Sequence, residues 1–328
     1  FLAYLFAAFG VLTVFGTGNA TQVNTITTAV NSALMNYHVI SKDAIPTSNL
    51  IQGIIIAVLV ALILLGGVKR IAQVTEKLVP FMALFYIVLA IGVILLNLNR
   101  IPSVFVSILE GAFRPSAVTV GIVGSMLMSV KKGVSRGIFS NESGLGSAPI
   151  AAAAAQTKEP VRQGLVSMTG TFIDTIVICT MTGLSIVITE TWNTGLEGVA
   201  ITTAAFQKGL PFPAQFASFA LMLCLVFFAF TTILGWDYYG ERCLEYLVNG
   251  KKFVITAFKW FYILAVFIGP FMTVSAVWTI ADICNGLMAF PNLVALLALN
   301  GDVVSETRGY LERVGIVKTT AVSYTHLR

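Results

Sequence analysis

The chain has 328 residues, of which 57% are hydrophobic and only 11% are charged, and its formal net charge is +5. Average soluble domains carry about 25% charged residues, so this chain has too few charged side chains to cover a surface in water. The composition excludes a soluble globular protein and predicts an integral membrane protein in contact with a lipid bilayer. The positive charge does not indicate nucleic-acid binding, because Lys and Arg in membrane proteins mostly reflect topology.

Eight apolar segments are long enough to cross a bilayer, which requires about 20 residues of helix. They lie at about 1–31, 50–68, 78–98, 104–133, 162–189, 213–247, 252–269 and 272–299, and the fourth is interrupted. Short polar linkers separate them. We therefore expect a single all-α transmembrane domain over residues 1–320.

Both ends of the sequence are unusual. The chain opens inside an apolar run without an initiator Met, and its last residues, "VSYTHLR", resemble a translated sequencing adapter. We expect a fragment truncated at its start, with residues 321–328 as a scar that takes no part in the fold.

Basic residues alternate between the linkers, which predicts the orientation of the spans. The linkers after spans two, four and six hold eleven Lys or Arg, whereas the opposite linkers hold only four, namely Lys42, Arg100, Arg114 and Lys208. We expect the richer linkers, and with them the C-terminus, to face the cytoplasm of a cell whose plasma or inner membrane holds the protein.

Polar residues interrupt the first span in the stretch "FGTGNATQVNTITT". Asn19 and Gln22 are three residues apart and so share a face of a helix, while Gly16 and Gly18 allow a backbone or a ligand to approach closely. The pattern fits a substrate-binding face, and it equally fits amide hydrogen bonds that hold helices together.

The stretch "TVGIVGSMLM" places two glycines in the middle of the fourth span. Gly121 and Gly124 flank Ile122 and Val123, and glycine weakens a helix. Broken helices mark binding sites in transporters because their freed N–H groups can hold a carboxylate. The alternative is a close crossing of two intact helices.

Hydroxyls and an indole cluster in the sixth span, in "FTTILGWDYYGER". Thr231 and Thr232 offer oxygen atoms, which a hard cation such as sodium prefers, and Trp236 follows Thr232 by one helical turn. Trp236 could line a pocket or anchor the helix at the headgroups. Asp237 is costly in a membrane and indicates a polar cavity around it.

Two further acids, Asp174 and Asp282, lie inside spans with hydroxyl or amide neighbours but with no obvious basic partner in the sequence. Each is either a relay for a proton or cation, or a structural carboxylate bonded to its own helix. The four cysteines, Cys179, Cys224, Cys243 and Cys284, have no metal-ligand spacing, so neither a zinc site nor a disulfide framework is predicted.

The stretch "SNESGLGSAPIAAAAA" is neither a phosphate-binding loop nor a nucleophile elbow. Gly144, Gly146 and Pro149 are expected to end a helix, and Ala151–Ala155 to begin another, because Ala is the best helix former. The small residues predict a joint at the cytoplasmic end of the fourth span, where a gate could close. Asn141, Glu142, Gly144 and Gly146 are its gate and scaffold residues. A hydrolase is disfavoured because the only histidines, His38 and His326, lie in a linker and in the scar.

These segments carry a family resemblance. "RGIFSNESGLGSAPIAAAAA", "VRQGLVSMTGTFIDTIVICT", "GGVKRIAQVTEKLVPFMALFY" and "FTTILGWDYYGERCLEYL" resemble the alanine or glycine:cation symporter family, in one register to about residue 318. The resemblance implies a LeuT-type fold with inverted repeats and a central site between broken helices. It also implies that the chain holds core helices three to ten.

The resemblance assigns roles residue by residue. Asn19, Gln22, Gly121, Ile122, Gly124, Thr232 and Trp236 would bind the substrate, and Thr231 with Thr232 would bind sodium. Asp237 stands where the family usually has a smaller neutral polar residue.

The implied function is symport of a small neutral amino acid, alanine or glycine, with sodium and with no cofactor beyond that coupling ion. A proton-coupled transporter of the same fold and an intramembrane enzyme are the alternatives.

Overall fold

The computed structural model describes residues 1–113 and 122–316, and no strand is present within these ranges. Residues 321–328, expected to be a scar, lie outside the described part of the chain. The all-helical architecture confirms the predicted fold class.

The first half of the chain contains helices of 13 to 30 residues, some of them separated by a π-helical or 3-10 turn. In chain order these are α1 (Leu2–Phe15), the π-helical turn η1 (Gly16–Ala20), α2 (Thr21–Asn36), η2 (Lys42–Ala44), α3 (Ile45–Leu64), α4 (Gly67–Leu96), η3 (Leu98–Arg100), α5 (Ile101–Phe113) and α6 (Ile122–Asn141). The segments α1, η1 and α2 form one continuous span of 35 residues.

The second half begins with the short helix α7 and ends with a polar helix, α14. Its elements are α7 (Ala148–Ala152), α8 (Pro160–Phe172), the π-helical turn η4 (Ile173–Cys179), α9 (Thr180–Ile188), η5 (Thr191–Asn193), α10 (Val199–Gly209), α11 (Ala214–Leu247), α12 (Lys252–Ile268), η6 (Gly269–Phe271), α13 (Val274–Ala298) and α14 (Asn300–Arg313).

Seven helical stretches in the described ranges are long and apolar enough to span a membrane, and they correspond to seven of the eight predicted spans. The eighth, predicted at 104–133, falls on α5, α6 and the residues between them that the structure does not describe. The chain is therefore a multi-pass membrane protein.

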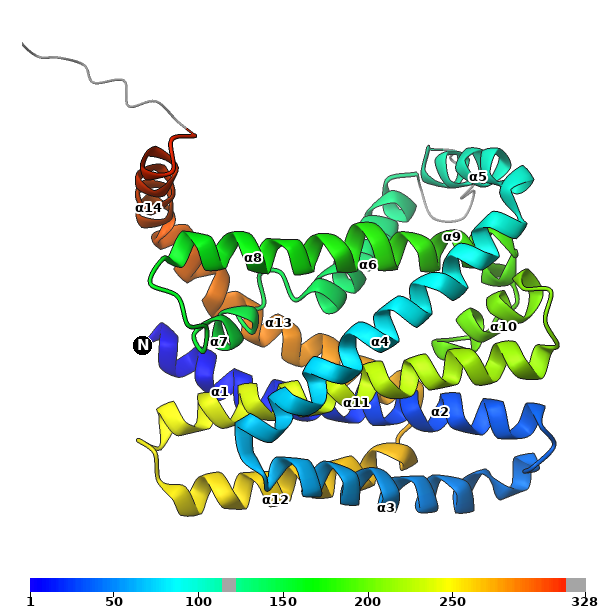
Figure 1. The fold of residues 1–328 in the computed structure, drawn as a ribbon, viewed down its shortest axis with the longest axis horizontal. Coiled ribbons are helices and arrows are strands. Elements are labelled where there is room, and N and C mark those ends of the chain that lie inside the picture. The colour runs from blue at the N-terminus through cyan, green and yellow to red at the C-terminus, as the bar shows by residue number, and fades with distance from the viewer. Residues whose placement is uncertain (114–121, 317–328) are drawn as a thin grey trace, which may run out of the picture.

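The long helices pass back and forth between two ends of the molecule (Figure 1). The helix α11 lies at the centre, where it packs against α1, α2 and α4, and α12 packs against α3. The chain's N-terminus and α14 lie at one end, together with the turn between α11 and α12. We call this the basic end, because Arg242, Lys251 and Lys252 lie there.

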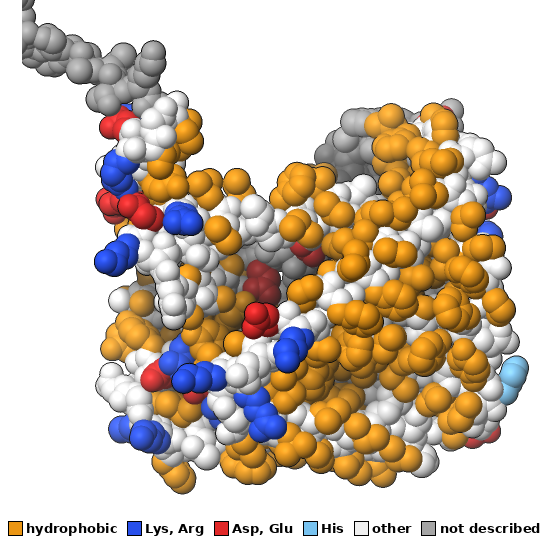
Figure 2. Space-filling model, in the orientation of Figure 1, with side chains coloured by type: hydrophobic (Ala, Val, Ile, Leu, Met, Phe, Trp, Pro, Cys, Tyr) orange, Lys and Arg blue, Asp and Glu red, His pale blue; other side chains and the backbone are white. Residues whose placement is uncertain are grey.

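The face shown in Figure 2 is largely apolar, as a lipid-facing surface must be, with charged side chains gathered toward the basic end. Large side chains such as Phe253 and Leu297 are 85% and 80% exposed. Figure 2 also shows a hollow between α8 and α11 with acidic side chains inside it. The predicted polar residues can be placed relative to this bundle.

Candidate functional site

The first span contains the π-helical turn η1, and its glycines allow the close approach that the sequence predicted. Gly18 lies directly against Trp236 of α11, and a Cβ atom at this position would overlap the indole. A Cβ at Gly16 would lie 3.0 Å from Ile280 of α13. The glycines therefore let two neighbouring helices reach the backbone of η1.

Side chains after the π turn bond to carbonyls five residues back rather than four. The Thr21 hydroxyl donates to the Gly16 carbonyl at 2.9 Å, and the Gln22 amide donates to the Thr17 carbonyl at 3.1 Å. These bonds satisfy carbonyls that the wider turn loosens. The Gln22 amide nitrogen is thus held on its own helix.

Asn19 is completely buried and faces α12. Its amide nitrogen donates to the Tyr262 carbonyl at 3.0 Å, and its amide oxygen has no hydrogen-bond donor among the described residues. Asn19 lies within the π turn and Gln22 lies after it in α2, and the two amides bond in different directions, to α12 and to η1. Their shared role in binding a substrate stays a prediction.

Trp236 lies inside the bundle and is 2% exposed. Its ring lies 5.5 Å from that of Tyr239, centroid to centroid, and the indole N–H reaches the Glu142 carboxylate. A Trp that anchors a helix at the headgroups is exposed on the lipid side. The burial therefore favours the predicted pocket position over an interface anchor.

The two adjacent hydroxyls of α11 bond to their own helix. Thr231 donates to the Phe227 carbonyl at 2.9 Å and faces Met82 of α4, whereas Thr232 donates to the Phe228 carbonyl at 2.8 Å. A hydroxyl that donates its proton keeps its lone pairs, so both oxygens remain able to ligate a cation.

The signature loop, residues 142–147, turns sharply between α6 and α7. Glu142, Gly144 and Gly146 adopt φ angles of 57°, 82° and 89°. The Ser147 hydroxyl donates to the Glu142 carboxylate at 2.5 Å. Burial raises the pKa of Glu142, and the hydrogen bonds from Ser147 and Trp236 offset this effect only in part.

Neighbouring helices clamp the signature loop. The Asn292 amide of α13 donates to the Gly144 carbonyl at 3.0 Å, and a Cβ at Gly146 would lie 2.5 Å from Phe6 of α1. Leu145 is completely buried. The loop is therefore a packed joint at the basic end rather than an open surface loop.

The second helix of this joint begins earlier than predicted. Pro149 does not end a helix; it lies in the first turn of α7, which spans Ala148–Ala152. Proline suits this position because its fixed φ is helical and its missing N–H would have no partner there. The expected helix over Ala151–Ala155 is thus wrong by three residues at each end.

Asp174 and Asp282 both have partners from distant helices. The Ser140 hydroxyl donates to both oxygens of Asp174, at 2.9 and 2.8 Å. Asp282 forms an ion pair with Arg136 of α6, whose guanidinium lies 4.5 Å from the Trp278 ring centroid. The expectation that Asp282 lacks a basic partner is wrong, because a residue 146 positions away supplies it.

Three predicted substrate residues cannot be placed. Gly121 lies outside the described residues, and the side chains around Ile122 and Gly124, at the start of α6, are likewise outside the described part. Asn141 is placed: its amide nitrogen donates to the Thr175 hydroxyl at 2.9 Å, which joins the end of α6 to η4.

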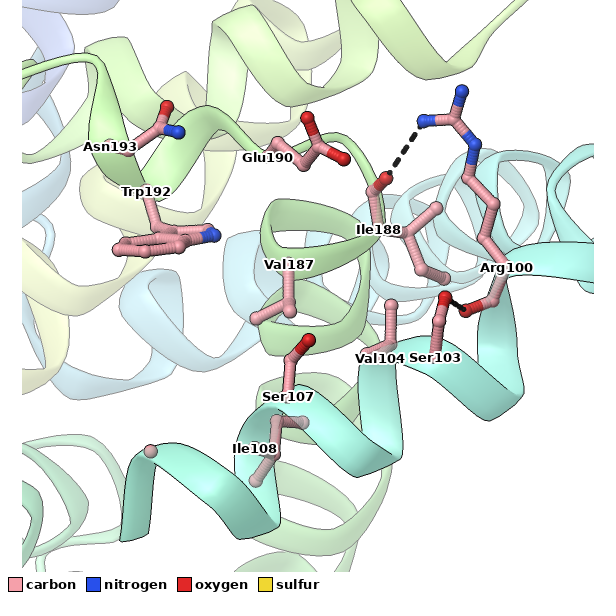
Figure 3. A pocket seen from close by; sticks show the side chains of 11 residues that line it. Arg100, Ser103, Val104, Ser107, Ile108, Val187, Ile188, Glu190, Trp192 and Asn193 are labelled. Atoms are coloured by element: carbon pink, nitrogen blue, oxygen red, sulfur yellow. Dashed lines mark hydrogen bonds between the residues drawn. The ribbon is translucent and has the colours of Figure 1, made fainter. Parts of the chain in front are cut away.

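A separate pocket of about 450 Å³ opens between α5 and the α9–η5 turn (Figure 3). Arg100 donates to the Ile188 carbonyl at 3.3 Å at its rim, and the Glu190 and Trp192 side chains lie opposite Ser107. Its lining includes none of the predicted site residues. It lies at the end of the bundle opposite the signature loop.

Comparison with known proteins decides the family. The family described as the sodium:alanine symporter family matches residues 1–322, which is nearly the whole chain. The chain belongs to the sodium:alanine symporter family. This confirms the resemblance that the signature segments carry.

Members of the sodium:alanine symporter family from bacteria and archaea are similar to this chain. It is 49% identical over 318 residues to an uncharacterized transporter of Haemophilus influenzae, covering 96% of the chain and 66% of that protein. It is 44% identical over 315 residues to the sodium/alanine symporter AgcS of Methanococcus maripaludis, covering 95% and 65%.

A third member, the sodium/proton-dependent alanine carrier protein of Bacillus sp. strain PS3, is 34% identical and covers 83% of the chain and 64% of that protein. This symporter-family chain thus spans slightly less than two thirds of the length of these three relatives.

Sequence reasoning missed several residues that shape this site in the symporter-family chain. Tyr262 bonds three helices together, and Asn292 and Phe6 hold the signature loop. Asn292 follows Pro291 inside an apolar span, and a polar residue at such a position could have indicated a contact with another segment. Phe6 and Tyr262 carry no such signal, since aromatic residues are common in membrane helices.

Proposed function

We propose that the protein carries out sodium-coupled symport of a small neutral amino acid, alanine or glycine, by alternating access. The match of residues 1–322 to the sodium:alanine symporter family carries this proposal. The name of the archaeal relative, a sodium/alanine symporter, agrees with it.

The sodium ion would use the hydroxyls of α11. Thr231 is 7% exposed and Thr232 is partly buried, and each already donates its proton to a backbone carbonyl. Their oxygen lone pairs are fixed by those bonds, which suits ligation of a hard cation. Sodium requires further oxygen ligands, which other helices of the whole protein would supply.

The size of the substrate would be limited by Trp236. The indole fills the space that Gly18 leaves free, so the wall behind it cannot move back. A rigid wall of this kind excludes larger side chains sterically and favours alanine or glycine. Gln22 and Thr232 would offer polar contacts, together with the glycines Gly121 and Gly124 of the fourth span.

The signature loop would form the gate at the basic end. Glu142 touches both the loop's own Ser147 and the pocket residue Trp236, so movement of the loop alters the surroundings of the indole. The positive φ angles at Glu142, Gly144 and Gly146 fix one loop shape. Opening of this joint would release the substrate toward the cytoplasm.

The basic end would face the cytoplasm of a bacterial or archaeal cell. The turn between α11 and α12 carries Lys251 and Lys252, and α14 lies at the same end. Positive residues favour the cytoplasmic side of a membrane. The C-terminus would then be cytoplasmic, in a plasma or inner membrane.

Uptake into vesicles tests this function. Because the chain spans less than two thirds of its relatives, it is joined to the upstream segment of the archaeal symporter and reconstituted beside the chain alone. We expect the joined protein to accumulate alanine when an inward sodium gradient is imposed at fixed pH. Alanine uptake that follows a proton gradient without sodium would instead favour the proton-coupled alternative. If neither gradient drives alanine uptake, the proposal is rejected.

A further inference from the structure

The carboxylate of Asp237 is buried in the scaffold with no hydrogen-bond donor. The residue is 0% exposed, and neither side-chain oxygen accepts a bond from any described residue. It lies on the face of α11 toward α1 and α12, because Gly240, one turn away, contacts Val14 and Phe258. A buried ionised carboxylate without partners is very costly in such surroundings.

The charged groups next to Asp237 form an unbalanced cluster. Lys259 of α12 pairs with Glu241 at 3.0 Å, and Arg242 pairs with Glu241 at 3.1 Å and with Glu245 at 2.6 Å. Lys259 also attracts the Asp237 carboxylate, so the two cations are shared among all three acids. With Asp237 included, three acids face two bases, so the cluster carries one surplus negative charge.

Other elements that pack near Asp237 do not supply the missing positive charge. Val14 of α1 lies against Gly240, and Gly18 of η1 lies against Trp236; both residues are uncharged. From α12, Tyr262 uses its hydroxyl to donate to the Ile233 carbonyl at 2.8 Å. From the signature loop, Glu142 approaches Trp236 and is itself an acid.

Asn19 of η1 holds a further buried oxygen without a donor in the described part of the chain. The Tyr262 carbonyl can only accept, so the amide nitrogen of Asn19 must face it and the amide oxygen must point away. That oxygen is also unpaired among the described residues. Around the junction of η1, α11 and α12, Asp237 and Asn19 thus hold three buried oxygen atoms without a donor among the described residues.

We propose that this junction binds one monovalent cation, a proton or a sodium ion, on the Asp237 carboxylate. One positive charge balances the cluster and gives the two Asp237 oxygens a partner. The site lies about 8 Å along α11 from Thr232, at a rise of about 1.5 Å per residue, so it is separate from the proposed substrate-linked sodium site. The bound cation stabilises the packing of α11 against η1 and α12.

Thermal unfolding of the purified chain in detergent tests this site without any transport. The midpoint is measured in sodium chloride and in choline chloride at equal ionic strength, and in mildly acidic and mildly alkaline buffer. A bound cation stabilises the folded state, and saturation raises the midpoint by on the order of 5 °C. A sodium effect at fixed pH identifies sodium, whereas an acid-dependent rise without a sodium effect identifies the proton.

The matched variants are Asp237→Asn and Thr279→Val. The neutral Asn removes the surplus charge. The unfolding midpoint of Asp237→Asn is therefore expected not to respond to sodium, and to respond to pH only as far as the other acids do. Thr279→Val, on an exposed face of α13, keeps the wild-type response. An Asp237→Asn protein whose midpoint still shifts like the wild type would overturn the proposal.

A second variant covers the case in which Asp237→Asn does not fold. Lys259→Gln removes one base and leaves the cluster with more negative charge, so cation binding tightens and the shift of the midpoint grows. A Lys259→Gln protein with an unchanged or smaller shift would also overturn the proposal. Because the readout is stability, failure of alanine uptake in the joined protein has no bearing on this result.

Discussion

At the scale of single residues, the most informative side chains are those whose polar atoms already make hydrogen bonds within the protein. Thr231 and Thr232 occupy adjacent positions on α11, yet one faces Met82 of α4 and the other is only partly buried. Because each donates to a carbonyl of its own helix, neither hydroxyl can rotate freely. The two oxygens are fixed before any ion arrives, which lowers the entropic cost of binding.

Replacement of Thr232 by Val keeps the shape of the side chain and removes its oxygen. In the joined protein we expect the sodium concentration for half-maximal alanine uptake to rise roughly tenfold to a hundredfold, since a bond to a charged group is worth about 1.5–3 kcal/mol. Thr279→Val is the control, because Thr279 makes the same kind of bond, to Ser275 at 2.8 Å, on an exposed face of α13. Equal sodium dependence in both variants would rule out the ligand role.

Replacement of Trp236 by Phe shortens the wall of the proposed pocket and keeps it aromatic. We expect alanine uptake to become sensitive to competition by larger neutral amino acids such as valine and leucine, because the pocket gains the space of the lost ring. The order of competitors measures this change. A variant that keeps the wild-type order while losing heat stability would show that Trp236 only packs the helices.

At the scale of elements, the signature loop combines three positive φ angles with contacts to two helices. Asn292 holds the Gly144 carbonyl, and Phe6 leaves no room for a side chain at Gly146. Such a loop has one low-energy shape when closed. Its opening must break the contacts with α1 and α13 together, which makes the joint cooperative.

Gly146→Ala is expected to destabilise the protein by about 1–3 kcal/mol, because its Cβ meets Phe6 and Asn292 at a φ of 89°. The thermal midpoint in detergent measures the loss. Gly164→Ala is the control, since Gly164 lies inside α8 with no atom within 4 Å of a Cβ placed there. That change should be neutral or stabilising by up to about 1 kcal/mol. Equal midpoints for the two variants would contradict the packing described for the loop.

The spans of this fold could be predicted from sequence because they rest on apolar composition alone, as α11 and α12 do. The contacts of the site could not, because they join residues far apart in the chain. Arg136 and Asp282 are separated by 146 positions, and the sequence around each residue does not indicate that the two form an ion pair. Pro149 lies in the first turn of α7 rather than at the end of a helix. Proline occurs at both positions, so the sequence alone does not distinguish them.

At the scale of the whole molecule, the two ends differ in charge. The turn between α11 and α12 is basic, whereas the opposite end carries the pocket of Figure 3 with Arg100 and Glu190. A protein with this asymmetry should insert in one orientation. The orientation also decides which end of the bundle the signature loop opens toward.

Single cysteines at Lys251 and Lys208 measure the orientation. In a background with the four native cysteines replaced, we expect Lys251→Cys to react with an impermeant maleimide only in inside-out vesicles. Lys208→Cys, near the end of α10, should react only in right-side-out vesicles. The reverse pattern would place the signature loop outside the cell and remove its role as the inner gate.

The π-helical turn η1 makes the first span one residue longer than a regular α-helix with the same contacts would need. Deletion of Ala20 should therefore let the span form a regular α-helix throughout. The residues of α1 and α2 would then still face the same neighbouring helices. Deletion of Ala29, inside α2, should instead rotate all later residues by about 100° and break the 2.7 Å bond between Asn31 and Asn49. If thermal unfolding shows the first deletion to be mild and the second severe, the turn is an inserted residue that the span can lose.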